Sequence, residues 1–213
     1  MLTFHIISIF PDSFSYLNES MLHRAQETKK IKIKVYNPRD FSRDKHKKVD
    51  ARPYGGGPGM VMSVDPILRA WKKASYQGPS LKKVKTIILS PRGKQFDNKI
   101  AQKFSKNYTD IILIAGHYEG IDARVKKITK AEEMSVGPYV LTGGELPAMI
   151  MIDSISRQIK GVLKEETSIE EKRIAGKDVY TRPETYVHKG KKYNVPKVLL
   201  SGHHKNIDEF RKK

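Results

Sequence analysis

The apolar positions of the chain predict a series of strands. Apolar residues run almost continuously through Phe4–Ile9 and Ile111–Ala115, which is typical of strands buried on both faces. In Ile31–Tyr36 apolar and polar residues alternate with a period of two, which predicts a strand with one face towards solvent. Val84–Leu89 and Glu133–Val136 are further strand candidates. Together these segments can form one sheet.

Helical stretches separate the predicted strands. Some carry apolar residues at helical spacing, and others have a recognisable start or stop, such as Pro66 directly after Asp65 and Gly161 after the longest stretch. Strands that alternate with helices indicate an α/β fold with a mostly parallel sheet and helices on both sides. The predicted helices are Met21–Thr28, Asp65–Tyr76, Asp97–Ser105, Ile121–Ile128 and Glu145–Lys160.

Composition divides the chain into three regions. Residues 1–163 carry the strand and helix pattern and form the expected main domain. Residues 164–180 are highly charged without an apolar stripe and are predicted to be a linker. Residues 181–213 hold nine Lys or Arg against three Asp or Glu. They are too few for a core of their own, so this small, mainly helical segment must dock on the main domain, a second subunit or RNA.

The charge and the absence of cysteine narrow the functional classes. Lys and Arg number 41 and Asp and Glu 23, a formal net charge of +18, which favours a nucleic acid as partner. Without cysteine, disulfides, thiolate nucleophiles and cysteine-ligated metals are excluded. No apolar run approaches the roughly 20 residues that cross a bilayer, and the N-terminus resembles a strand rather than a signal peptide. We expect a cytoplasmic protein that has no membrane partner.

Three turns that contain glycine follow predicted strands, at 90–93, 116–120 and 137–144. In open α/β sheets, ligands bind at the carboxyl ends of the strands, where glycine lets the backbone approach them closely. One such turn would be weak evidence, because each could be an ordinary loop. Three in series favour a small-molecule site.

The segment 37–63 lacks periodicity and is long for a connection inside a domain. Its cluster Gly55–Gly59 lacks the Lys-Ser/Thr of a phosphate-binding loop and the third glycine of a dinucleotide fingerprint. Tyr54 and several basic residues nearby suit base stacking and phosphate contacts. We therefore expect this loop to face RNA, the alternative being a plain surface turn.

The histidines do not predict a metal site. His117 and Glu119 match the H-x-E pattern of zinc deaminases, but the cysteines that those sites need are absent. His203–His204 is more typical of a solvated pair than of metal ligands. Glu119 and Asp122 follow a strand and could orient a ligand, although Asp122 fits the start of a helix equally well.

Six sequence blocks carry a specific resemblance. They are YGGGPGM at 54–60, LSPRG at 89–93, GHYEGIDAR at 116–124, SVGPYVLTGGELPAM at 135–149, YTRPE at 180–184 and VPKVLLSG at 195–202. In this order, and over nearly the whole chain, they resemble the bacterial tRNA (guanine-N1)-methyltransferases of the TrmD type, in the SPOUT superfamily.

The resemblance implies methyl transfer from S-adenosyl-L-methionine to N1 of the guanine 3′ to the tRNA anticodon, tRNA position 37. It implies a deep C-terminal trefoil knot in the α/β domain and a homodimer with active sites at the interface. It also implies that residues 181–213 bind tRNA, although this segment is shorter than in the family. Mg²⁺ has been associated with the family, but no ligand cluster in the sequence shows a metal site.

The resemblance also assigns roles to residues. Catalysis is expected to involve Arg157, Glu119 and, as general base, Glu171. The substrate RNA is expected to contact Asp50, Arg52, Tyr54, Gly55, Gly56, Gly57, Pro58, Gly59 and Arg182. The cofactor is expected to contact Leu89, Ser90, Pro91, Gly116, Tyr118, Glu119, Ser135, Val136, Gly137, Pro138, Tyr139, Val140, Leu141, Gly143, Gly144 and Pro147.

The linker departs from the family pattern. The family's usual base is an aspartate in this stretch, and counting from Arg157 puts Lys172 at its position. A lysine accepts a proton only if its pKa is strongly lowered. Glu171 is therefore the preferred base, with Glu170 and Asp178 as alternatives. The other readings are a SPOUT methyltransferase with a different RNA target, and a homologue that binds S-adenosylmethionine or RNA without catalysis.

Overall fold

The computed structural model describes residues 1–76, 83–163 and 178–212. It forms two compact units, Met1–Leu163 and Lys164–Lys213. Unit 1 is an α/β domain around a five-stranded parallel sheet with the strand order β2-β1-β6-β5-β7. This confirms the predicted parallel α/β architecture. The strands are β1 (Leu2–Ile7), β2 (Ile31–Tyr36), β5 (Val84–Gln95), β6 (Asp110–Ile114) and β7 (Glu132–Ser135).

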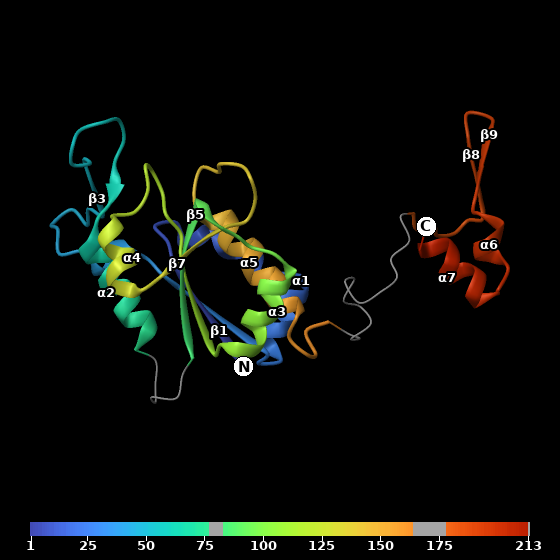
Figure 1. The fold of residues 1–213 in the computed structure, drawn as a ribbon, viewed down its shortest axis with the longest axis horizontal. Helices are drawn as coiled ribbons and strands as arrows, with labels where there is room; N and C mark the ends of the chain where they lie inside the picture. The colour runs from blue at the N-terminus through green and yellow to red at the C-terminus, as the bar shows by residue number, and fades with distance from the viewer. Residues whose placement is uncertain (77–82, 164–177, 213) are drawn as a thin grey trace. The chain divides into compact units, whose positions relative to one another are not determined.

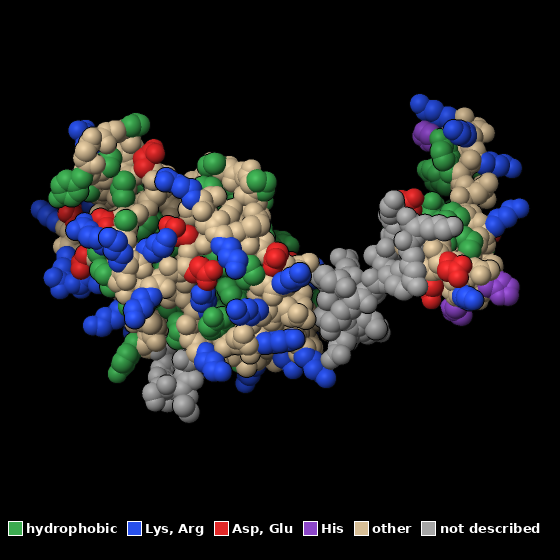
Figure 2. All heavy atoms as spheres, viewed as in Figure 1, with side chains coloured by type: hydrophobic (Ala, Val, Ile, Leu, Met, Phe, Trp, Pro, Cys, Tyr) green, Lys and Arg blue, Asp and Glu red, His purple; other side chains and the backbone are tan. Residues whose placement is uncertain are grey.

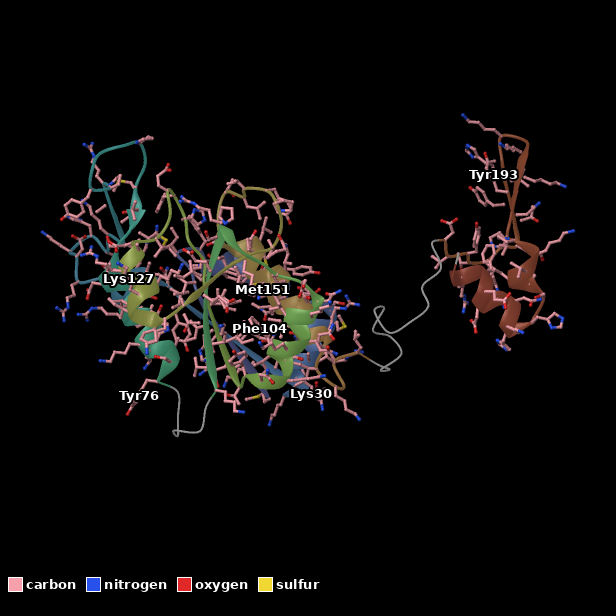
Figure 3. The ribbon with its side chains drawn as sticks, viewed as in Figure 1. Lys30, Tyr76, Phe104, Lys127, Met151 and Tyr193 are labelled. Carbon is pink, nitrogen blue, oxygen red and sulfur yellow. The ribbon has the colours of Figure 1, made fainter. Side chains whose placement is uncertain are left out.

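Helices cover both faces of this sheet (Figure 1). On one face lie η1 (Pro11–Asn18), α1 (Ser20–Glu27), α3 (Asn98–Asn107) and α5 (Glu145–Arg157), and on the other η2 (Pro38–Phe41), α2 (Val64–Ser75) and α4 (Ala123–Thr129). Successive residues of β6 point to opposite faces: Ile111 and Leu113 join the first core, Ile112 and Ile114 the second. Figure 3 shows Phe104 of α3 and Met151 of α5, which both belong to the first core.

Some element boundaries differ from the sequence prediction. The predicted turn Ser90–Gly93 lies within β5, whose pairing with β7 shifts register between Leu89 and Lys94. Helix α2 begins at Val64 with Ser63 as N-cap, one residue before the predicted start at Asp65. Pro66 is tolerated there because the first-turn amides need no partner within the helix.

The end of α5 also differs. The helix was predicted to run to Lys160, but it ends at Arg157. Amides of the next residues bond three positions back, Gln158 to Ile155 and Ile159 to Ser156, which is the tighter geometry common at helix ends. Gly161 then takes a left-handed backbone conformation, with φ +83°.

The segment 37–63 contains more structure than its composition suggested. Besides η2, it holds a short antiparallel ribbon of β3 (Asp50–Ala51) and β4 (Val61–Met62). This ribbon brackets the glycine cluster, so the cluster is the loop of a hairpin-like element.

Unit 2 holds two helices, α6 (Lys197–Leu200) and α7 (His204–Lys212), and a hairpin of β8 (Thr185–His188) and β9 (Lys191–Asn194), on which Figure 3 labels Tyr193. No apolar pattern predicts this hairpin, because its strand residues are all exposed and lack a regular apolar alternation. The local signal was Lys189-Gly190, whose positive φ angles suit a two-residue hairpin turn.

A buried polar network crosses three strands of unit 1. The fully buried His5 of β1 bonds through Nε2 to an Asp110 carboxylate oxygen and through Nδ1 to the Tyr36 hydroxyl, each at 3.0 Å. Burial raises the pKa of Tyr36, and the charge of Asp110 raises it further. The hydroxyl therefore stays protonated and donates to Nδ1, which leaves the Nε2 proton for Asp110.

Removing the Asp110 carboxylate should destabilise the protein strongly. In Asp110→Ala the buried imidazole keeps a donor that has lost this acceptor, which costs about 3 kcal/mol. Urea unfolding followed by circular dichroism measures this. As a matched control, Glu27→Ala breaks the exposed His23–Glu27 pair of α1 (3.4 Å) and should change stability little. Equal unfolding midpoints for the two variants would show that the buried network contributes no more to stability than the exposed pair.

Candidate cofactor pocket and RNA-facing loop

The three segments predicted as turns, of which 90–93 lies inside β5, line a single cavity of about 500 Å³ in unit 1. Such a volume suits a cofactor-sized molecule. The cavity lies beyond the carboxyl ends of β6 and β7 and beside residues 88–92 of β5, as expected for an open α/β sheet. Of the expected cofactor residues it is lined by Leu89, Ser90, Pro91, Gly116, Tyr118, Glu119, Ser135, Val136, Tyr139, Val140, Leu141, Gly143, Gly144 and Pro147.

Two expected cofactor residues, Gly137 and Pro138, do not line the cavity. They lie in the same loop, and the Ser135 hydroxyl stabilises its start by donating to the Gly137 carbonyl at 2.8 Å. The cavity is also lined by residues that were not assigned to the cofactor: Ile88, Arg92, His117, Gly120, Ile121, Asp122, Ala123, Lys126, Glu133, Met134 and Thr142. Several of them lie inside or beside the six sequence blocks that resemble the methyltransferase family. Their place in the sequence could therefore have indicated that they line the cavity.

Glycine is required where the turns touch each other. A Cβ on Gly144 would lie 2.5 Å from the Ala115 Cα, and the Gly144 amide donates to the Gly116 carbonyl at 2.9 Å. A Cβ on Gly93 would collide with the backbone of Met134 in β7. At these contacts the backbone segments lie directly against each other, which fixes the positions of their donors and acceptors.

Carboxylates give the cavity an acidic side. Asp122 is held by Arg124 through two bonds of 2.9 and 2.7 Å, and this contact lowers the pKa of Asp122. Glu133 pairs with Lys126 at 2.8 Å. Among the described residues, Glu119 makes no ion pair. A bound group with a positive charge would therefore find an unneutralised carboxylate at Glu119.

The loop between β3 and β4, residues 52–60, contains the glycine cluster and is called the glycine loop below. It is hydrogen-bonded to the cavity turn 116–120. The Glu119 amide donates to the Met60 carbonyl at 3.0 Å, and the Met62 amide donates to the Gly120 carbonyl at 2.9 Å. A Cβ on Gly59 would lie 2.5 Å from the Glu119 side chain. Glu119 therefore faces both the cavity and the loop predicted to meet RNA.

The loop itself is open. Tyr54 is fully exposed, and four glycines, Gly55, Gly56, Gly57 and Gly59, have positive φ angles that other residues rarely adopt. A surface of this kind can meet a large partner without a steric barrier. Asp50 lies in β3 opposite Met62, and Arg52, Tyr54 and Pro58 follow on the exposed arm.

The expected catalytic residues do not gather in unit 1. Glu119 lines the cavity, but Arg157 lies in the last turn of α5 and does not. Asp153, one turn before Arg157, has a raised pKa because of burial, partly offset by the Arg157 charge. Glu171, Glu170 and Lys172 lie outside the described residues.

Arg182 and Asp178 belong to unit 2. They border a hollow of about 840 Å³ lined largely by apolar side chains, among them Val195 and Leu199. This hollow is larger than the cavity of unit 1, but it lacks the convergent glycine turns. We therefore place the candidate cofactor site in unit 1.

Within residues 1–76, 83–163 and 178–212, no group of three or more His, Asp or Glu side chains is arranged to hold a metal ion. None of the helices described there is long and apolar enough to span a membrane. The two residues of the H-x-E pattern are used separately, because His117 bonds to Glu145 at 2.9 Å while Glu119 turns to the glycine loop.

Comparison with known proteins identifies the family. The model of the family "tRNA (Guanine-1)-methyltransferase TrmD" matches residues 2–213. A tRNA (guanine-N(1)-)-methyltransferase of Clostridioides difficile is 49% identical over 98% of this chain and 90% of its own length. Its counterparts in Carboxydothermus hydrogenoformans and Pseudoalteromonas atlantica are 45% and 44% identical, over 98% and 99% of this chain and 80% and 78% of their own lengths. The chain therefore belongs to the TrmD family of tRNA (guanine-N1)-methyltransferases.

Proposed function

We propose that this protein transfers a methyl group from S-adenosylmethionine to N1 of the guanine 3′ to the anticodon of tRNA, in the cytoplasm. The observation that carries the proposal is the cavity formed by the three glycine turns in a chain of this family. The glycine loop bonded to the turn 116–120 supports a substrate base that approaches from that side.

The cavity fits the proposed methyl donor in volume and in chemistry. Backbone groups of the turns at 89–91 and 135–144 suit the edge of an adenine, and glycines leave room for it. S-adenosylmethionine, when bound, supplies a methyl group already activated on a positively charged sulfur. Glu119 faces the cavity as the carboxylate that balances such a charge. The chain's own contribution is to align the reactants.

The target nitrogen of guanine carries a proton, so the chain must supply a general base. We propose Glu171 for this role, with Glu170 and Asp178 as alternatives, because the residue counted to the family's base position is Lys172. An arginine stabilises the charge that grows on the guanine O6 side as the proton leaves. Arg157 is the proposed arginine.

The position of Arg157 supports a dimer. Along helix α5, about 15 Å separate Pro147, which lines the cavity, from Arg157 in the last turn. Arg157 thus cannot serve the cavity at the start of its own helix. We propose that a second copy supplies it. Leu146 and Ile150, one turn apart on α5, are 54% and 44% exposed and offer an apolar face for that copy.

We further propose that the segment with the three turns is threaded as a deep trefoil knot. The close approach of Gly144 to Ala115 supports this, and so does the bond from Ser8, after β1, to Glu145 at the start of α5. In unit 2, the basic residues of 181–213 are the proposed tRNA contacts. Figure 2 shows Lys and Arg side chains over the visible face of unit 1 as well, which suits a polyanionic substrate.

The proposed reaction predicts product on one tRNA and not on its matched control. Single-turnover incubation with S-adenosylmethionine and an unmodified transcript should yield N1-methylguanine next to the anticodon. A transcript with adenine at that position should yield none. Mass spectrometry of nuclease digests measures both. A methyl group elsewhere would mean a different RNA target. Measurable binding of donor and tRNA with no product would mean that catalysis has been lost.

Glu171→Gln should slow the single-turnover rate by at least about a hundredfold, because the amide cannot accept the N1 proton. The affinity for S-adenosylmethionine should not change. Glu170→Gln is the matched control in the same stretch. If only the control slows the reaction, the base is Glu170. If neither does, Asp178 is the next to test.

Two inactive variants should restore each other. Arg157→Ala removes the arginine, and Ser90→Trp fills the cavity. In a co-expressed mixture, about half of the dimers contain one copy of each variant, and each such dimer has one complete site. Activity should return to about a quarter of wild type. A mixture as inactive as its components would show that Arg157 serves the cavity of its own chain.

A further inference from the structure

A hydrogen-bonded network joins His117, which lines the cavity, to Ser8 and Glu145 behind it, and it has no part in the mechanism above. The Ser8 hydroxyl donates to Glu145 Oε1 at 2.6 Å, and His117 Nε2 lies 2.9 Å from Glu145 Oε2. Because an ionised carboxylate only accepts, His117 Nε2 must carry the proton. The Phe10 amide donates to the Ser8 oxygen at 3.0 Å, and the Phe10 ring meets the His117 ring edge-on at 4.8 Å.

The network joins three places that are distant in sequence. Ser8 follows β1, His117 lies in the turn after β6, and Glu145 opens α5. Ser8 and Glu145 are buried, and the His117 side chain is only 19% exposed. The carboxylate sits in the first turn of a helix, where negative charge is favoured. Each of its oxygens has a donor, so the buried charge is compensated on both sides.

The bond between His117 and Glu145 crosses directly over Gly143. A Cβ on Gly143 would collide with His117 Nε2 and with Glu145 Oε2. The pair therefore packs against the backbone of a turn that lines the cavity. The neighbouring Gly144 is held from the other direction by the Gly116 carbonyl. Between them these contacts determine where the turn can lie.

His117 is also connected to the RNA-facing side. Its amide donates to the Met62 sulfur at 3.3 Å, and Met62 follows directly on the glycine loop. The same turn carries Glu119, which touches Gly59. The His117 backbone makes this contact, so a change of the side chain alone leaves the support of the glycine loop in place.

We propose that His117 and Glu145 are positioning residues that hold the 143–145 turn in the conformation that binds the methyl donor. The inference rests on the proposed function, since it assumes that S-adenosylmethionine occupies this cavity. Neither residue needs to contact the reacting atoms. The role is to make the turn rigid before the donor arrives, so that binding does not have to order it.

The test measures S-adenosylmethionine binding by calorimetry, without tRNA. His117→Leu keeps the bulk of the ring and removes the donor. His117→Gln restores an N–H at similar reach. His23→Leu is the matched control, because His23 also pairs with a glutamate, Glu27, but on the exposed face of α1. Thermal unfolding of each variant shows whether it is folded.

We expect His117→Leu to bind S-adenosylmethionine at least about tenfold more weakly than wild type, a typical loss for one hydrogen bond to a buried charge. His117→Gln should recover most of that loss, and His23→Leu should bind as wild type. In the methylation assay, KM for S-adenosylmethionine should rise in His117→Leu while KM for tRNA stays within about twofold. Rescue by glutamine would not follow from a purely space-filling role.

Wild-type affinity in folded His117→Leu would overturn the inference and leave the proposed function standing. A wild-type protein that does not bind S-adenosylmethionine would overturn both. If His117→Leu does not fold, the inference can be tested on the wild-type protein by nitrogen NMR of the His117 imidazole. An Nε2-bound proton whose signal shifts and exchanges more slowly on addition of S-adenosylmethionine supports the inference. An unaffected ring, or a proton on Nδ1, contradicts it.

Discussion

The close approach of Gly144 to Ala115 and Gly116 is the constraint on which the site depends. It brings the loop before α5 against the turn after β6, at a separation that excludes any side chain at Gly144. Because that loop begins at the end of β7 and β7 pairs with β5, the contact also closes the wall to which residues 88–92 of β5 contribute. One cavity bordered by these three segments results.

Charge is distributed in keeping with this geometry. The net charge of +18 suits a polyanion, yet the cavity itself carries carboxylates. Two of them, Asp122 and Glu133, are paired with Arg124 and Lys126. The protein thus combines a basic exterior, which suits RNA over a distance, with one carboxylate in the cavity, Glu119, that makes no ion pair among the described residues.

The residues proposed for catalysis do not all lie at the cavity of unit 1. Glu119 faces the cavity, whereas Arg157 is separated from it by most of the length of α5, and the proposed bases lie beyond residue 163. The proposed mechanism therefore depends on the proposed second copy, which would supply Arg157. An exposed apolar face on α5, next to the cavity, offers the surface for such an assembly.

The sequence by itself determined the five strands of the main sheet, the helices α1 to α5 of unit 1, and the segments that line the cavity, one of which proved to lie inside β5. These features follow from local periodicity and from glycine, whose effects extend over a few residues. It did not reveal the β8–β9 hairpin, the His5–Asp110 pair or the bond between His117 and Glu145. The last two join residues 105 and 28 positions apart. Only the order of strands in the sheet brings such residues together, and no local pattern encodes that order. The tertiary structure therefore decided which turns meet, which histidine is buried, and that Arg157 lies away from the cavity.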